Sequence, residues 1–203
     1  MAISEKIISH IPFLTLAILG LSLVTYALPE VSAAFIYDRK AIFEGEIWRL
    51  LSSHLVHFTN LHLFYDLLAF GMAGWIIEYR TYRYFGLLCI LMAFFISLSL
   101  LIMKPNMIYY GGLSGLVYGA MCYLALWGLR DLQPWRSMAI VILFFMPIKF
   151  LFDFYLNESI LPYTKSHVFQ PMHLSHIIGC LVALCLFFII RFNEYRQNPV
   201  EIR

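Results

Sequence analysis

The chain has 203 residues, of which 62% are hydrophobic, 17% are aromatic and only 13% are charged. Soluble domains are usually about 45–50% apolar and about 25% charged, so 14 basic and 12 acidic side chains are too few to cover a soluble globule of this length. The abundance of Leu, Ile, Phe and Val excludes a disordered chain. A net charge of +2 is too small to indicate nucleic acid as a partner. What remains is an integral protein whose main partner is the lipid bilayer.

Six apolar segments approach the length of about 20 residues that a helix needs to cross a bilayer core of about 30 Å. We therefore expect an all-α, polytopic membrane protein, with residues 1–203 forming a single domain built on six transmembrane helices. The expected helices cover residues 11–28, 61–77, 84–103, 114–129, 138–156 and 172–190. The first segment also has features of a cleaved signal peptide, because Lys6 precedes it and small residues follow it, so that alternative stays open.

Basic residues in short connections favour the cytoplasmic side of a membrane. The larger group of them lies on the side that also holds both termini: Lys6, Arg80, Arg83, Arg130, Arg136, Arg191, Arg196 and Arg203. We therefore expect both termini in the cytoplasm and the long first loop (residues 29–60) on the outer face. In this loop Tyr37, Trp48 and Phe58 suit the interfacial aromatic belt, and we expect Trp48 and Arg49 to fold the loop.

Three of the six segments run in the same direction and carry a polar residue at a similar depth. His62, Ser114 and His176 each lie about 15 or 16 residues from the charge at the cytoplasmic edge, or about 23–24 Å along a helix. Polar groups inside a bilayer are costly, so each is a candidate for function. The sequence thus predicts one cluster of His, Ser and His in the outer half of the membrane.

The serine lies in Gly111-Gly112-Leu113-Ser114-Gly115, at the expected first turn of a helix. Backbone N–H groups are unsatisfied there, and together with the helix dipole they would stabilise a developing oxyanion. The alternative is that Ser114 only caps the helix and that the glycines only pack it.

The sixth segment contains His176 followed by Gly179, one turn later. Gly115 and Gly119 form a face of small residues on the fourth helix, and Gly179 lies on a matching face of the sixth. Packing of these faces would bring His176 near Ser114, where an imidazole can activate the hydroxyl. Tyr118 lies one turn after Ser114, on the same face of the fourth helix. There it either stacks on the imidazole of His176 or is an ordinary packed aromatic residue.

These motifs resemble those of the rhomboid intramembrane serine proteases. The matching residues follow the family order over nearly the whole chain: Trp48-Arg49, His57-Phe58, His62, Gly112-Leu113-Ser114-Gly115 with Tyr118, and His176-x-x-Gly179. The resemblance implies a Ser–His dyad without an acidic third member and without metal or cofactor. Ser114 would be the nucleophile and His176 the general base, and the backbone N–H of Ser114 and His62 would hold the oxyanion. Gly112, Leu113 and Tyr118 would support them.

One position departs from the family pattern. Rhomboids usually carry Asn one turn after the oxyanion histidine, whereas this chain has Asp66. An ionised carboxylate cannot donate a hydrogen bond to an oxyanion. Asp66 would therefore be protonated, or it would orient His62 or a water molecule.

Within the superfamily the chain most resembles the rhombosortase branch, in the first loop from Tyr37 to His57 and in the run from His62 to Asp66. That resemblance implies cleavage of exported proteins held by a C-terminal anchor of glycines, a hydrophobic helix and basic residues. Transpeptidation is a further outcome, because a buried site could exclude water in favour of an amine. The resemblance also implies a bacterial inner-membrane protein whose active site opens to the periplasm.

Two other functions remain as alternatives. The first is a membrane zinc hydrolase, because imidazole and carboxylate groups suit zinc. Its ligands would come from His54, His57, His62, Asp66, His173 and His176. The second is a rhomboid-like protein that binds membrane helices without catalysis, although such proteins lack the serine or the histidine that this chain has.

Lys149 and Asp153 lie one turn apart in the fifth segment. They would form a local ion pair that reaches towards the outer surface. The alternative is that they line the route by which a substrate helix enters.

Overall fold

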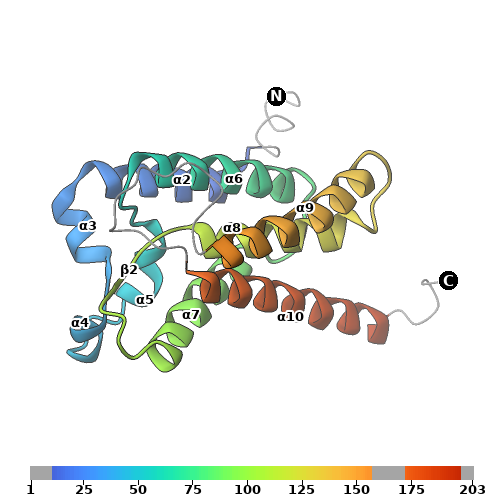
Figure 1. The fold of residues 1–203 in the computed structure, drawn as a ribbon. Coiled ribbons are helices and arrows are strands. Elements are labelled where there is room, and N and C mark those ends of the chain that lie inside the picture. Colours follow the sequence, from blue (N-terminus) through green and yellow to red (C-terminus); the bar gives the residue numbers. More distant parts are fainter. Residues whose placement is uncertain (1–10, 157–171, 198–203) are drawn as a thin grey trace, which may run out of the picture.

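The structure, a computed structural model, describes residues 11–156 and 172–197. The expected cytoplasmic termini lie outside these residues. The described part is helical apart from loops and one two-stranded sheet (Figure 1). The long helices are α2 (Phe13–Ala27), α6 (Asn60–Tyr79), α7 (Phe85–Met103), α8 (Ser114–Gly128), α9 (Trp135–Leu156) and α10 (His173–Gln197). The short elements are α3 (Pro29–Phe35), β1 (Tyr37–Asp38), α4 (Arg39–Phe43), α5 (Arg49–Ser52), the 3-10 helix η1 (Ser53–Leu55) and β2 (Tyr109–Tyr110).

Helix α8 forms the centre of the bundle. Of its 15 residues 11 are buried, and it packs against α6, α7, α9 and most extensively α10. Among the described residues, α6, α7, α9 and α10 are each long and apolar enough to cross a membrane. The pair α2 and α3 passes together with a bend of 113°, whereas α8 is a shorter apolar helix of 15 residues. The chain is thus an all-α, polytopic membrane protein.

The expected helices overlap the observed ones, and two of the expected ends differ by three residues or more. Helix α9 begins at Trp135 rather than at 138, and α10 continues to Gln197 rather than ending at 190. Arg191 is compatible with a continuing helix because its guanidinium pairs with Glu194, almost one turn further on. A charged residue therefore marks the end of an apolar segment without ending the helix.

Glu78, near the end of α6, links this helix to α2. Its carboxylate accepts hydrogen bonds from the backbone N–H groups of Leu14 (3.0 Å) and Thr15 (3.3 Å) in the first turn of α2. These donors have no partner within their own helix, and a negative charge is favourable at that end of the helix dipole. Gly74 of α6 lies directly against the side chain of Thr15, so α2 and α6 pack closely along their length.

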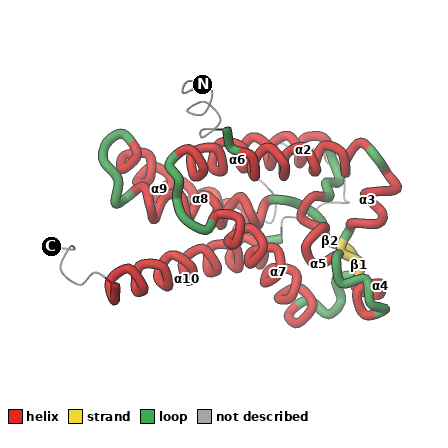
Figure 2. The backbone as a smooth tube through the Cα atoms, turned by 180° about the vertical axis from the view of Figure 1, so that it is seen from behind, coloured by secondary structure: helices red, strands yellow, loops and turns green. Residues whose placement is uncertain are grey.

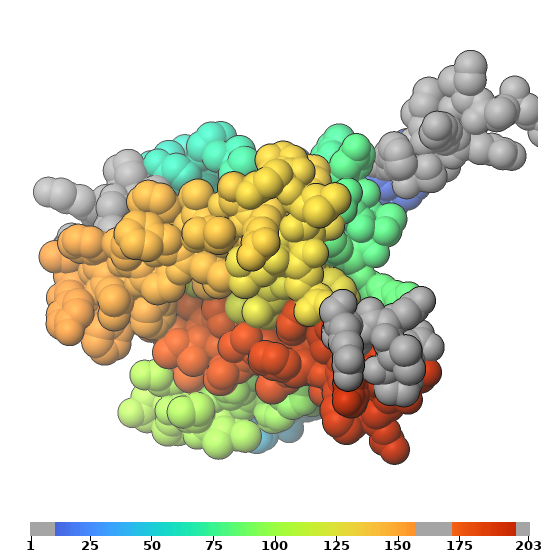
Figure 3. All heavy atoms as spheres, turned by 90° about the vertical axis from the view of Figure 1, so that its right-hand side faces the viewer, coloured from blue at the N-terminus to red at the C-terminus, as the bar shows by residue number. Residues whose placement is uncertain are grey.

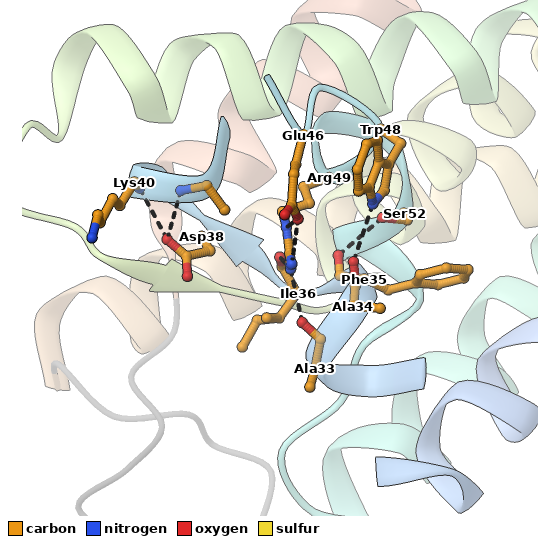
Figure 4. Close-up of polar contacts among 11 residues, drawn as sticks. Ala33, Ala34, Phe35, Ile36, Asp38, Lys40, Glu46, Trp48, Arg49 and Ser52 are labelled. Carbon is orange, nitrogen blue, oxygen red and sulfur yellow. Dashed lines mark hydrogen bonds and ion pairs between the residues drawn. The ribbon is translucent and has the colours of Figure 1, made fainter. Parts of the chain in front are cut away.

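The first loop is folded by side chains that satisfy the carbonyl groups at the end of α3 (Figure 4). The pairs are Arg49 with Ala33 and Ile36, both at 2.8 Å, Trp48 with Ala34 at 3.2 Å, and Ser52 with Phe35 at 3.0 Å. Glu46 holds the guanidinium of Arg49 in place at 2.6 Å. The predicted role of Trp48 and Arg49 in folding this loop is confirmed, because the last carbonyls of a helix need donors from elsewhere.

The small sheet attaches the first loop to the segment that precedes α8. Strands β1 and β2 are antiparallel, with Tyr37 opposite Tyr110 and Asp38 opposite Tyr109 (Figure 2). Tyr37 is consequently buried, and the expectation that it belongs to an interfacial belt is wrong. Trp48 and Phe58 do keep exposed surface. The sheet and the elements α3, α4 and α5 gather at one end of the bundle, where α8 and α10 begin (Figure 1).

Candidate active site

Ser114 is the first residue of α8, as the sequence predicts, and its side chain is half-buried. The residue at the capping position is Leu113, so the serine is not itself the cap. The first loop supports Gly111 and Gly112, the glycines that precede Ser114. The N–H of Gly112 donates to the carbonyl of Ser53 at 3.3 Å, and a Cβ on Gly111 would lie 3.0 Å from the carbonyl oxygen of Val56. The start of α8 is therefore held against the first loop.

Helices α8 and α10 approach each other closely at their glycines. A Cβ on Gly179 would collide with the carbonyl oxygen of Gly115, and one on Gly119 would lie 2.7 Å from the carbonyl oxygen of Gly179. A Cβ on Gly115 would lie 3.2 Å from the Cβ of Ser175. The predicted contact between the two small-residue faces is confirmed. Ser114 directly precedes Gly115, and His176 directly follows Ser175. The contact therefore places Ser114 and His176 on neighbouring helices at the same level of the bundle.

Tyr118 orients the imidazole of His176. The two rings are stacked, with centroids 4.1 Å apart and planes inclined by 11°. His176 is 5% exposed, and its Nδ1 has no hydrogen-bond partner among the described residues. Of the two interpretations of Tyr118, the structure supports stacking on the histidine.

Lys149 and Asp153 form the expected ion pair, and Asp153 is buried. The ammonium group also lies over the ring of Tyr118, 5.8 Å from its centroid. It therefore contacts α8, where the π electrons of the tyrosine stabilise a cation. Lys149, Tyr118 and His176 form a consecutive series of contacts.

A pocket of about 210 Å³ opens beside His176, between α9 and α10. Its lining is almost entirely apolar: Tyr118, Met146, Pro147, Phe150, His176, Ile177, Cys180 and Leu181. The two helices lie next to each other on the face drawn in Figure 3, α9 in yellow and orange and α10 in red. Sequence reasoning did not identify Phe150, whose ring contacts both Tyr118 and His176. Nothing in the sequence distinguishes it from the other phenylalanines, which number 18 in all.

His62 and Asp66 of α6 face the glycines that precede Ser114. A Cβ on Gly112 would lie 2.8 Å from Cε1 and 3.0 Å from Nε2 of His62. Gly112 has φ +138°, a conformation that an L residue rarely adopts. One carboxylate oxygen of Asp66, Oδ2, lies 3.2 Å from Nε2 of His62 and 3.2 Å from Nε2 of His57. Asp66 therefore contacts both histidines.

The six side chains considered as zinc ligands do not form one group. His57, His62 and Asp66 converge. His54 instead binds the carbonyl of Ala93 at 2.9 Å and the hydroxyl of Ser97 at 3.1 Å, and so attaches the first loop to α7. His173 packs against the rings of α9, including those of Phe150 and Phe154.

Comparison with known proteins gives two results. The Rhomboid domain family matches residues 44–192, well over half of the chain. The Rhomboid protease GlpG of Haemophilus influenzae is 33% identical over 84 residues, which cover 40% of this chain. The matched region spans 42% of that relative, less than half of its length.

The family match contains the later part of the first loop, helices α6 to α9 and most of α10. It also contains every residue of the candidate site described above. The chain therefore belongs to the rhomboid family of integral membrane proteins.

Proposed function

We propose that this protein is an intramembrane serine protease in which Ser114 is the nucleophile and His176 is the general base. The observation that carries this proposal is the close contact of α8 and α10 at Gly115, Gly119 and Gly179. It brings the helix start that bears the serine to the level of the histidine. The stack of Tyr118 on His176 further supports the proposal, because a general base must be held in one orientation.

The proposed reaction follows the chemistry of acyl transfer. The Oγ of Ser114 would attack the scissile carbonyl carbon while His176 takes the hydroxyl proton. The tetrahedral intermediate would collapse when His176 returns this proton to the leaving amine. Water, deprotonated by His176, would then hydrolyse the acyl-enzyme and restore Ser114. An amine in place of water would give transpeptidation.

The oxyanion would be held by the backbone N–H of Ser114 and by the imidazole of His62. The contact between His62 and Gly112 supports this assignment, because Gly112 lies two residues before the serine. Donors fixed before the reaction cost no reorganisation in the transition state. Leu113 and Gly112 would shape the backbone on this side, and Asp66 would orient His62.

The proposed substrates are transmembrane proteins that carry a C-terminal anchor of glycines, a hydrophobic helix and basic residues, as for rhombosortases. The protein would lie in a bacterial inner membrane with both termini in the cytoplasm and the site open to the periplasm. A substrate helix would approach beside α9, the pair Lys149 and Asp153 lining its route. Helix α9 suits this role because only 11% of its apolar 18-residue stretch is buried inside the protein. The corresponding share is 39–44% in α6, α7 and α10.

A zinc hydrolase is the second candidate, and the convergence of His57, His62 and Asp66 is the observation that favours it. It differs from the first candidate in what activity requires. A zinc hydrolase would lose activity with a chelator and keep it after Ser114→Ala, whereas a serine protease would show the reverse.

The test uses the purified protein in liposomes with a fusion substrate that ends in a glycine-containing transmembrane anchor. Cleavage by the wild type and its loss in Ser114→Ala and His176→Ala are expected. A fluorophosphonate probe should label the wild type and not Ser114→Ala.

Two control variants match the catalytic ones. Ser137→Ala removes a hydroxyl that is bonded only locally, to Gln133 in the loop before α9, and His173→Gln removes the other histidine of the same turn of α10. Both should retain cleavage. Cleavage that persists in Ser114→Ala would overturn the assignment.

A further inference from the structure

The cluster of His57, His62 and Asp66 has a feature that serine catalysis does not require. The three side chains are 0%, 1% and 7% exposed, and a single carboxylate oxygen lies between two imidazole nitrogens at equal distances of 3.2 Å. His62 and Asp66 share one face of α6, four residues apart, and His57 comes from the end of the first loop. The ligand atoms of all three lie within 4.8 Å of one another.

The hydrogen bond on the other side of His57 defines its tautomer. Its Nδ1 lies 3.1 Å from the carbonyl oxygen of Leu55, which can only accept, so the proton is on Nδ1. In a neutral ring the lone pair of Nε2 then points at the oxygen of Asp66, which is also an acceptor. This contact requires a proton between the two atoms, carried by the ring or by the carboxyl group, or a cation that binds both atoms.

We infer that His57, His62 and Asp66 form a binding site for a divalent transition-metal ion such as Zn²⁺. Imidazole and carboxylate groups are ordinary zinc ligands, and bonds of about 2.0–2.2 Å in a tetrahedron place neighbouring ligand atoms about 3.3 Å apart. The two nitrogen–oxygen distances of 3.2 Å match this spacing, and the ligand atoms of the whole set lie within 4.8 Å of one another, so the two imidazoles would move closer together when the metal binds. An N–H donated by the distal imidazole nitrogen to a backbone carbonyl, as from His57 to Leu55, is the usual support of a metal-binding histidine.

The carboxylate distinguishes this site from a hydrogen-bond network built on asparagine. It supplies one negative charge to a buried cation, which an amide cannot do. With three protein ligands, the fourth position of the metal stays open, as in sites that bind water or a substrate oxygen. Gly112 lies on this side of the cluster, where a Cβ would be 3.9 Å from Oδ2 of Asp66.

A bound metal would act as an inhibitor rather than a cofactor, a consequence that rests on the proposed serine protease function. The metal takes the lone pair of Nε2 in His62, and that nitrogen then has no N–H to donate to the oxyanion. Loss of one oxyanion donor costs about 100- to 1,000-fold in rate, so we expect Zn²⁺ to lower cleavage by at least about tenfold. The metal binding itself does not depend on which reaction the protein catalyses.

Binding is tested by equilibrating the purified protein with Zn²⁺ in detergent at about pH 8, because metal binding releases protons and is favoured at higher pH. Metal analysis after dialysis should give about one tightly bound Zn²⁺ per chain. Asp66→Asn keeps the shape of the side chain and removes the charge, and it should weaken binding at least about 100-fold. His57→Gln should do the same, and thermal unfolding confirms that each variant is folded.

His173→Gln is the matched control, because this histidine lies outside the cluster, and it should bind Zn²⁺ like the wild type. Absence of tight binding in the wild type, or equal binding by a folded Asp66→Asn protein, would overturn the proposal and assign the contact to a proton. The proposal would also be contradicted if Zn²⁺ inhibited the wild type and His173→Gln were the one variant that escaped this inhibition. Cleavage by the metal-free protein is judged separately with Ser114→Ala, so the two proposals fail independently.

Discussion

The imidazole of His176 and the phenol ring of Tyr118 lie face to face, with centroids 4.1 Å apart. The two residues belong to α10 and α8, and the backbones of these helices approach closely at their glycines. The ammonium group of Lys149 also lies over the ring of the tyrosine, 5.8 Å from its centroid. A ring stacked on the imidazole fixes the plane of that imidazole, and this plane determines which direction its nitrogen lone pair takes.

Replacing the tyrosine therefore tests the orientation of the base. Stacked aromatic pairs contribute about 0.5–1.5 kcal/mol beyond their buried area, so Tyr118→Ala should lower kcat about tenfold, with a smaller effect on KM. Tyr118→Phe keeps the ring and should stay within about threefold of the wild type. Cleavage kinetics and the rate of fluorophosphonate labelling at Ser114 measure the effect. An equal loss in the Phe and Ala variants would show that the hydroxyl, not the ring, is required.

The contact of α8 with α10 should not tolerate a single methyl group. In Gly179→Ala the new Cβ meets the carbonyl oxygen of Gly115 and lies 3.1 Å from its carbonyl carbon, and backbone atoms cannot rotate away. We expect destabilisation by about 2 kcal/mol or more, together with loss of cleavage as the helices separate.

Gly20→Ala in α2 is the matched control, since nothing lies within 4 Å of its Cβ position. It should leave thermal stability unchanged or raise it slightly, because alanine favours a helix. Equal unfolding temperatures of the two variants would contradict a close contact between α8 and α10.

The sequence predicts those parts of the fold that depend on local composition. Apolar runs and the charges beside them locate the helices, and the spacing of Gly115, Gly119 and Gly179 predicts the close contact of α8 with α10. Both signals are repeated along one helix face, so they can be read without knowing the neighbours of that face.

Features that depend on distant pairing could not be predicted. Tyr37 is buried because its strand pairs with the strand of Tyr110, which lies 73 residues later in the sequence. The choice of His57, rather than His54, as the partner of Asp66 depends on how the first loop turns before α6. Histidines three residues apart have the same apparent suitability for a metal until the fold separates them.

Asp66 should be replaceable by the residue that rhomboids usually carry. Asp66→Asn preserves the size of the side chain and can still donate to or accept from His57 and His62. We expect a folded protein that retains at least part of its cleavage activity. Asp66→Leu should be worse, because both imidazoles would lose a buried partner. Complete loss of cleavage in a well-folded Asp66→Asn protein would show that the carboxylate itself is needed.

Arg49 should not be replaceable by lysine. Its guanidinium reaches two carbonyl groups and the carboxylate of Glu46 in different directions, which an ammonium group cannot do at once. We expect Arg49→Lys to cost about 2–3 kcal/mol and to expose the first loop to limited proteolysis. Lys40→Met, which removes an exposed partner of Glu44, should change stability by less than about 0.5 kcal/mol. Equal protease sensitivity of the two variants would argue against this role for Arg49.

His54 should make stability depend on pH. Burial lowers the pKa of His54 to about 4, although its hydrogen bonds to backbone groups act in the opposite direction. In the unfolded chain this pKa is about 6.5, so below that pH the unfolded state binds a proton that the folded state excludes. The contribution of His54 is thus fully present above about pH 6.5 and is lost as the pH falls to about 4. One proton corresponds to about 1.4 kcal/mol per pH unit, or about 3 kcal/mol over this range. His54→Gln keeps a donor for the carbonyl of Ala93 but cannot titrate, so its free energy of unfolding should fall less steeply between these pH values. Parallel pH profiles for the wild type and His54→Gln would mean that protonation of other groups governs the acid sensitivity.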